Sequence, residues 1–489
     1  MKIKMMNLKQ SLFIIAVVCA TMSIAQPIEG TLNWYNQGGQ GMFTEKAYKY
    51  LKKKESKTVI VGVIDSGVDI EHEDLKGKIW LNADEIAGNG IDDDGNGYVD
   101  DVHGWNFLGN EKGEHLNEAR LEKTRILAEL IKKYDGVYVN DADLADLGLY
   151  LQVKEEVEAG RAQFEQYMGM LDKLPENAQN YIKSQMDYNL NVDFDDRRLI
   201  GDDPDDFTDV NYGNADVEGP DALHGTHVSG IIGAIRGNEL GGDGVAENVK
   251  IMVLRAVPNG DEFDKDIALA VRYCVDNGAE VINMSFGKAY SPHQKEVYEA
   301  FKYADENGVL LIHAAGNDAK DIDVEPNYPT SMYSFQKSPL DHFVTIGAST
   351  KNKGAEMVAS FSNFGAKGVD VFAPGFEIYN TVPQSEYMNL QGTSMAAPQV
   401  CGVVALYAQS APGLTPAKMK EVVLDTETTG ISIKEGHRIV EIGCIELENL
   451  IPTKNKFHCY LNPERKVSEK ALEVHGYTDE FLAAQKKFK

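Results

Sequence analysis

The amino-acid sequence predicts an α/β fold built around a doubly wound parallel sheet. Short β-branched runs recur along the chain, and amphipathic helical patterns lie between them. Continuous apolar runs of this length are typical of strands that helices cover on both faces. Strands that alternate with helices need crossover connections, and these connections make neighbouring strands parallel.

Five runs are predicted to be buried strands, and three segments are predicted to be helices. The strands are expected at Thr58–Ile64, Val249–Val257, Ala279–Ser285, Val309–Ala314 and Phe343–Ala348. The helices are expected at 44–54, 264–277 and 294–307. Gly278 and Gly308 follow the last two helices, at the position where a helix end favours glycine.

Residues 109 to 216 interrupt this alternation. The stretch is rich in charge, and Leu116–Tyr134 and Leu144–Leu171 show apolar residues at spacings of three and four. This pattern predicts a helical insertion on the surface of the sheet domain. Whether the insertion is a lid, a partner surface or only a decorative pair of helices stays open at this point.

The first 25 residues have the order of a secretory signal peptide. Lys2, Lys4 and Lys9 form a basic start, Leu12–Ala20 is apolar, and Ser23–Ala25 is a small-x-small cleavage site. The apolar run is too short to span a bilayer, and no other stretch approaches a membrane span. We therefore expect export to the periplasm or the exterior after cleavage. Residues 26–58 are interpreted as an N-terminal lead-in.

The charge of the chain limits its partners. It contains 48 Lys and Arg residues against 76 Asp and Glu residues, a formal net charge of -28. Such a surface repels DNA and anionic membranes, so nucleic acid is not an expected partner of the main domain. The cysteines show no metal-ligand spacing, and a disulfide framework is not indicated.

Three short segments carry side chains suited to nucleophilic catalysis. Asp65 ends the first predicted strand, His224 opens a helix, and Ser394 opens another within Gly-Thr-Ser-Met-Ala-Ala-Pro. A serine hydroxyl needs an adjacent base, and histidine has a suitable proton affinity. A buried carboxylate then orients the histidine and stabilises its charged form. Asn317, in Ala-Ala-Gly-Asn, can donate its side-chain amide to an oxyanion beside the backbone N–H of Ser394.

These segments, in the order Asp, His, Ser, resemble the subtilisin-like serine protease family, or subtilases. The resemblance covers about residues 59–421 apart from the insertion, and the peptidase domain is placed at 59–422. It implies a subtilisin-like sheet and a secreted serine endopeptidase that hydrolyses polypeptides through an acyl-enzyme. The chemistry would need no cofactor.

The resemblance also assigns roles to individual residues. It implies that Asp65 orients, His224 is the base, Ser394 attacks and Asn317 completes the oxyanion hole. It further implies that the strand segment Ser285, Phe286 and Gly287 pairs with the substrate backbone. Adding a peptide as an extra strand is a physically reasonable way to hold it extended.

A second candidate site is an acidic loop. Asp92, Asp94, Asn96 and Asp100 fall at positions one, three, five and nine of a calcium-binding loop of the EF-hand type. Position twelve is His103 where such a loop carries a bidentate glutamate. A structural calcium site and a plain acidic turn are therefore both open.

Residues 423–489 resemble a different family. A strand pattern there ends in Asp425-x-Glu427, which is similar to the first motif of the 3′-5′ exonucleases of the DNA polymerase III epsilon type. In that family the two carboxylates would bind divalent ions for phosphodiester hydrolysis. The other ligands would lie beyond Lys489, so we expect an incomplete, truncated α/β fragment that is not functional. The alternatives to a peptidase are accordingly a metal-dependent nuclease and an inactive hybrid.

Overall fold

The structure is a computed structural model of the chain. It describes residues 32–51, 56–134 and 143–410. Beyond residue 410 it describes only short segments, which are 426–428, 439–448, 451–462, 478–483 and 486–487. The predicted signal peptide lies outside the described residues.

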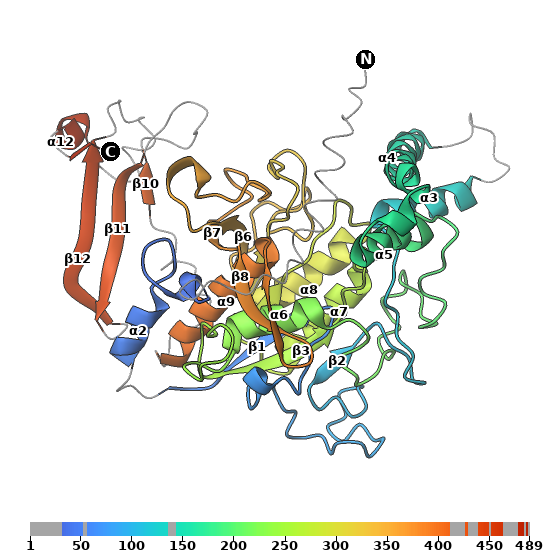
Figure 1. Cartoon of the computed structure of the whole chain (residues 1–489), viewed down its shortest axis with the longest axis horizontal. Helices are drawn as coiled ribbons and strands as arrows, with labels where there is room; N and C mark the ends of the chain where they lie inside the picture. Colours follow the sequence, from blue (N-terminus) through green and yellow to red (C-terminus); the bar gives the residue numbers. More distant parts are fainter. Residues whose placement is uncertain are drawn as a thin grey trace.

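Seven parallel strands form the central sheet, in the order β2-β3-β1-β4-β5-β6-β7 (Figure 1). Their bounds are β1 Val59–Asp65, β2 Gly104–Asn106, β3 Val249–Arg255, β4 Val281–Met284, β5 Leu310–Ala314, β6 Phe343–Ser349 and β7 Val371–Pro374. The parallel α/β fold that the sequence predicts is thus confirmed. The strand β1 lies between β3 and β4, so the strand order changes direction beside it.

Helices cover both faces of this sheet. The four main helices are α6 Leu223–Gly233, α7 Asp264–Asp276, α8 Gln294–Glu306 and α9 Thr393–Ser410. The side chains of Val59, Val61 and Val63 on β1 pack in one core cluster with residues of α6 and α9. Ile60 and Ile64 pack in a second cluster with residues of α7 and α8. Because successive side chains of a strand point to opposite faces, the sheet is buried on both sides.

Smaller elements complete the domain around the sheet. The lead-in contains the 3-10 turn η1 Trp34–Asn36 and the helix α2 Thr44–Leu51, and Tyr35 is buried in the core that includes α6 and α9. An antiparallel hairpin of β8 Ile378–Val382 and β9 Glu386–Leu390 lies beside α6. Two further 3-10 turns are η2 Glu73–Leu75 and η6 Gly354–Glu356.

The insertion between β2 and α6 forms a helical unit with its own apolar cluster. Its helices are α3 Glu122–Lys133, α4 Leu144–Met168 and α5 Glu176–Ser184, with the 3-10 turn η4 Leu171–Lys173 and the π turn η5 Gln185–Asn189. Figure 1 shows α3, α4 and α5 gathered together to one side of the sheet. Leu127, Val153, Phe164 and Ile182 are among the residues of the cluster. Its described residues, 109–134 and 143–216, contain no strand beyond isolated bridges.

The described part of the C-terminal segment contains a second sheet. Its order is β10-β11-β12-β13, with β10 Thr426–Thr428, β11 Ile439–Glu448, β12 Ile451–Asn462 and β13 Lys486–Lys487. The first three strands are antiparallel, and β13 is parallel to β12. A short helix, α12 Asp479–Ala483, precedes β13. Among all described residues, none forms a helix both long and apolar enough to cross a membrane.

Candidate active site

The sequence-predicted site residues come from the carboxyl ends of adjacent strands and the starts of two helices. Asp65 is the last residue of β1, Ser285 follows β4 directly, and Asn317 lies three residues beyond the end of β5. His224 and Ser394 are each the second residue of a helix, α6 and α9. In open α/β sheets this edge, where the strand order reverses, is the usual place for a site.

Asp65 and His224 form a short polar contact. The Nδ1–H of His224 donates to Oδ1 of Asp65 at 2.7 Å, and the same oxygen accepts the N–H of Ser66 at 2.8 Å. The Asp65 side chain is 2% exposed, whereas that of His224 is 37% exposed. Burial alone would lower the pKa of His224, but the charge and hydrogen bond of Asp65 raise it above 6.5, with help from Asp221. The contact also fixes the tautomer, so that Nε2 is the free acceptor of the ring.

Ser394 and Ser285 bind each other through two reciprocal hydrogen bonds. The hydroxyl of Ser394 donates to the carbonyl oxygen of Ser285 at 3.1 Å, and the hydroxyl of Ser285 donates to the carbonyl oxygen of Ser394 at 3.0 Å. The start of α9 is therefore fastened to the segment that follows β4. Ser394 itself is only partly buried.

Thr393 orients the side-chain amide of Asn317. The Oδ1 of Asn317 accepts the N–H of Thr393 at 2.8 Å and its hydroxyl at 3.1 Å. The Thr393 hydroxyl in turn accepts the N–H of Gly316 at 3.0 Å. Because Thr393 engages the amide oxygen, the NH₂ group is the donor that the exposed side chain of Asn317 can offer to a ligand.

His227 has a structural position. It is fully buried, and its Nε2–H donates to the carbonyl oxygens of Ile378 at 3.0 Å and Met388 at 3.1 Å. Burial lowers the pKa of this imidazole to about 3, so it stays neutral at ordinary pH. His227 thereby ties α6 to the β8–β9 hairpin.

The segment after β4 forms one edge of a cleft of about 700 Å³. Ser285, Phe286 and Gly287 line this cleft together with Asp65 and His224. The carbonyl oxygen of Phe286 accepts a hydrogen bond from the buried His313 at 2.8 Å. Val257, Pro258, Asn259 and Gly260, which follow β3, also line it. The structure thus brings the predicted base, its carboxylate and the predicted substrate segment to one cavity.

Lys288 is a residue of this region that sequence reasoning missed. It follows Gly287 directly, and its Nζ binds Glu122 of α3 at 2.6 Å and Asp264 of α7 at 2.8 Å. Its side chain is 2% exposed. The sequence signal for a buried ion pair was a lysine directly after an apolar buried strand. Its partner Glu122 could not be inferred, because it lies 166 residues away in the chain.

Comparison with known proteins identifies the main part of the chain. A model of the subtilase family matches residues 56–440. The chain belongs to the subtilase family. The match confirms the resemblance seen in the motifs, and it extends past residue 421, where the motif-based limit was placed.

Several known proteins match less than half of this chain, at 32–37% identity. A thermophilic serine proteinase of Bacillus sp. (strain AK1) is 37% identical over 204 residues, which are 42% of this chain and 46% of that protein. Thermitase of Thermoactinomyces vulgaris is 36% identical over 186 residues, which are 38% and 61% of the two chains. Subtilisin DY of Bacillus licheniformis is 32% identical over 222 residues, which are 45% and 76%.

The chain spans only part of some of these subtilases. It matches 13% of subtilisin-like protease 2 of Plasmodium falciparum, with 39% identity over 188 residues. A crystal structure of a cold adapted subtilisin-like serine proteinase aligns with 76% of this chain and 82% of its own, with a TM-score of 0.42 and 22% identity. A model of an exonuclease family matches residues 422–489, so the two family models overlap at 422–440.

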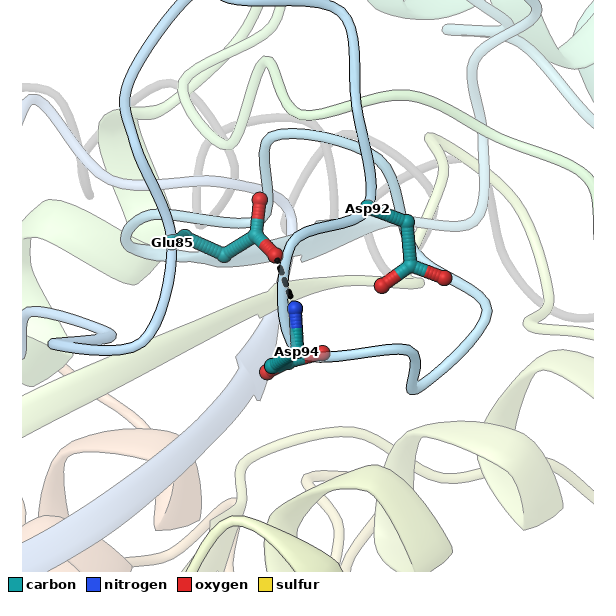
Figure 2. Close-up of side chains that lie close together, drawn as sticks. All are labelled: Glu85, Asp92 and Asp94. Carbon is teal, nitrogen blue, oxygen red and sulfur yellow. Dashed lines mark hydrogen bonds between the residues drawn. The ribbon is translucent and has the colours of Figure 1, made fainter.

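The acidic loop of this subtilase gathers three carboxylates. Glu85, Asp92 and Asp94 each offer an oxygen, and these oxygens lie within 4.8 Å of one another. Figure 2 shows the three side chains and the hydrogen bond from the Asp94 N–H to Glu85. Glu85 is 9% exposed, and its Oε2 is buried with no hydrogen-bond partner among the residues that the structure describes. Hydrogen bonds from the N–H groups of Gly95, Asn96 and Gly97 outweigh burial and lower the pKa of Asp92.

The other two predicted loop ligands are engaged differently. Asp100 accepts the N–H groups of Asn89 at 3.0 Å and Gly90 at 2.9 Å, and it is not part of the three-carboxylate group. Asn96 turns its amide nitrogen toward Asp94 and Asp101. Glu85 is the member that sequence reasoning missed, because it lies before the motif and reaches the loop only through the fold.

The nuclease-like residues are described only in part. Asp425 lies outside the described residues. Glu427 lies on β10, opposite Glu441 on β11, and only the backbone is described there. The two residues therefore stay a prediction from the sequence.

Proposed function

We propose that this subtilase is a secreted serine endopeptidase that hydrolyses peptide bonds of polypeptides through Asp65, His224 and Ser394. The observation that carries the proposal is the 2.7 Å contact between Asp65 and His224, on the cleft that the Ser285 segment lines. Membership of the subtilase family and the serine proteinase relatives support the same activity.

The proposed reaction begins at the Ser394 hydroxyl. In the resting protein this hydroxyl donates to the Ser285 carbonyl, so it must turn its proton toward Nε2 of His224 before attack. Apo hydrogen bonds of this kind often align only with substrate present. His224 takes the proton as the oxygen attacks the scissile carbonyl carbon, and Asp65 stabilises the imidazolium. The imidazolium then protonates the leaving amine, which leaves an acyl-enzyme.

Water completes the cycle by the same route. His224 removes a proton from the attacking water, the acyl bond to Ser394 breaks, and the serine oxygen regains its proton. The tetrahedral intermediates carry an oxyanion, which the Asn317 amide and the backbone N–H of Ser394 would bind. The hydrogen bonds from Thr393 support this role, because they occupy the amide oxygen of Asn317 and leave its NH₂ group as a donor.

Labelling with a fluorescent organophosphonate tests the proposed function. We expect the purified protein to be labelled covalently, Ser394→Ala to remain unlabelled, and Ser334→Ala, which removes an exposed serine, to label as the parent does. Labelling that persists in Ser394→Ala would refute the assignment of the nucleophile. A parent protein that is never labelled would refute the activity itself.

We also propose that the protein is exported after removal of residues 1–25. The basic start, the short apolar run and the small-x-small site support this. The N-terminal sequence of the mature protein tests it, and the expected first residue is Gln26. A mature chain that retains its basic start would contradict the proposal.

We further propose that the group of Glu85, Asp92 and Asp94 holds a calcium ion. Carboxylate oxygens are the ligands that calcium prefers, and the buried, unpartnered Oε2 of Glu85 needs a positive partner. Bound calcium would brace the loop before β2. Titration calorimetry with calcium should give one site in the parent and none in Asp92→Asn, while Asp209→Asn, an exposed change elsewhere, should bind as the parent does.

A further inference from the structure

The helical insertion supplies one wall of the candidate substrate cleft. Asn117 and Glu118, which precede α3, line the cleft of about 700 Å³. Asn180, Tyr181 and Ser184 of α5 line the same cleft, as does the segment Ser285–Gly287. The insertion is therefore part of the surface that a bound polypeptide would touch.

One edge of this wall is fastened to the loop after β3. The N–H of Asn259 donates to the carbonyl oxygen of Asn117 at 2.7 Å, and the N–H of Ala119 donates to the carbonyl oxygen of Asn259 at 3.1 Å. Gly260 permits this approach, because its φ is +145° and a Cβ there would lie 2.2 Å from the carbonyl oxygen of Ala119. The side chain of Asn189, on the π turn, donates to the carbonyl oxygens of Ala119 and Asn259.

The other edge of the wall is fastened to the end of the substrate segment. Glu122 of α3 binds Lys288 at 2.6 Å and Arg125 at 2.6 Å, and all three side chains are under 10% exposed. Arg125 and Lys288 both donate to the carbonyl oxygen of Glu262. With one edge held by backbone hydrogen bonds and the other by a buried group of charges, the wall has a fixed place in the cleft.

The carboxylate of Glu118 is held toward the cleft by neutral donors. Its Oε2 accepts the hydroxyl of Ser184 at 2.7 Å and the amide of Asn259 at 3.0 Å. Within the part of the chain that the structure describes, no lysine, arginine or histidine pairs with it. Its position is thus preorganised, while its charge has no cationic partner.

The cleft as a whole has a negative lining. Asp65, Glu118, Asp221 and Glu262 line it, and among its described lining residues none is lysine or arginine. Asp65 is engaged by His224, and the charges of Lys288 and Arg255 act on Glu262 and Asp221. Among the described residues that line the cleft, Glu118 is therefore the carboxylate without a cationic partner. In a cavity with low-dielectric walls, uncompensated charge of one sign attracts the opposite charge.

Glu262 is a buried member of this cleft lining. Its side chain is 2% exposed, and its Oε1 is buried with no hydrogen-bond partner among the described residues. Burial raises the pKa of this carboxyl to about 8, although the charge of Lys288 opposes the shift. Glu262 is therefore neutral at neutral pH, and the negative charge of the cleft rests on the other carboxylates.

We infer that Glu118 is a specificity-determining residue that selects a lysine or arginine side chain in the stretch of substrate lying beside Ser285–Gly287. The inference rests on the proposed endopeptidase function. The cationic group would lie against Glu118 and bring donors to the acidic wall, while the substrate backbone lies along the segment after β4. The insertion then sets which polypeptides are cleaved.

Quenched fluorescent peptides test this selection. One series carries lysine, norleucine or glutamate in turn at each position near the scissile bond, and kcat/KM is measured for each peptide. At one position the parent should prefer lysine to norleucine, and Glu118→Gln should reduce that ratio about three- to fivefold, as expected for a partly exposed ion pair. Glu118→Lys should reverse the preference in favour of glutamate. Glu111→Gln, an exposed change outside the cleft, should keep the parent ratio.

Two outcomes would overturn the inference. The first is a parent protein whose kcat/KM is about equal for lysine and norleucine peptides at every position. The second is a preference for lysine that Glu118→Gln leaves intact. Organophosphonate labelling separates these from failure of the proposed function, because a labelled parent without lysine preference refutes only the selection. If Glu118→Gln fails to fold, the lysine preference of the parent is measured at increasing ionic strength. The inference requires that this preference shrink as ionic strength rises.

Discussion

Nδ1 of His224 donates to Oδ1 of Asp65 at 2.7 Å, and Asp65 lies almost fully buried at the end of β1. The contact joins two segments that are 159 residues apart in the chain. It holds the imidazole in one tautomer and raises its pKa against the effect of burial. The predictions for activity follow from this pair.

Replacing Asp65 with asparagine should lower kcat by roughly 10⁴-fold. The amide cannot stabilise an imidazolium, and it can donate to Nδ1, which favours the tautomer that blocks Nε2. Single-turnover hydrolysis of a quenched peptide measures the effect. Circular dichroism and thermal unfolding serve as the control for folding. A variant that folds as the parent does and keeps most of its kcat would contradict the role of Asp65.

Replacing Asp221 with asparagine should move the acid limb of the kcat/KM profile to lower pH. His224 must be neutral to act as a base, so activity is lost as pH falls through its pKa. The negative charge of Asp221 contributes to raising that pKa, and its removal should lower it. The pH profiles of kcat/KM for the parent, Asp221→Asn and Glu111→Gln test this. Only Asp221→Asn should move the acid limb.

Replacing Asn317 with alanine should lower kcat about 10²- to 10³-fold, with a smaller effect on KM. The side-chain amide would donate to the oxyanion only after attack, so its loss acts on the transition state. Asp318→Asn, an exposed neighbouring change, is the matched control. A raised KM with kcat unchanged would instead argue for a ground-state role of Asn317.

The central fold is predictable from the sequence because its strands and helices each have a local sequence pattern. Buried parallel strands such as Thr58–Ile64 are continuous β-branched runs, and the helix patterns at 264–277 and 294–307 end within one residue of α7 and α8. The edge strand Gly104–Asn106 escaped prediction, because three residues carry no periodicity. Its place in the sheet depends on pairing with β3.

The residues of the candidate site are predictable where they belong to short sequence motifs. Asp65, His224 and Ser394 each stand at a strand end or a helix start, and the fold brings Asp65 and His224 into contact. The roles of Glu118 and Lys288 were not predictable, because each depends on contacts between the insertion and distant loops. Charge in a surface helical pattern does not reveal which carboxylate will face a cleft.

Breaking the buried ion pair between Glu122 and Lys288 should strongly destabilise the fold. Replacing Glu122 with glutamine removes the negative charge that both Lys288 and Arg125 contact, while these two cations stay buried. Breaking a buried pair by removing one partner costs about 3–5 kcal/mol in the free energy of unfolding. Urea unfolding at neutral pH measures the loss, and Glu111→Gln, on the exposed surface, should change it little.

The same pair should have a defined dependence on pH. Burial would raise the pKa of Glu122, but the charges of Arg125 and Lys288 lower it from 4.5 to about 2. A carboxyl whose pKa is lower in the folded state stabilises the fold above its unfolded pKa and loses that effect as pH falls toward the folded one. The difference in unfolding free energy between parent and Glu122→Gln should therefore shrink as pH falls from about 4.5 toward 2. A difference that stays constant over this range would mean that the loss comes from packing and that the charge of Glu122 contributes little.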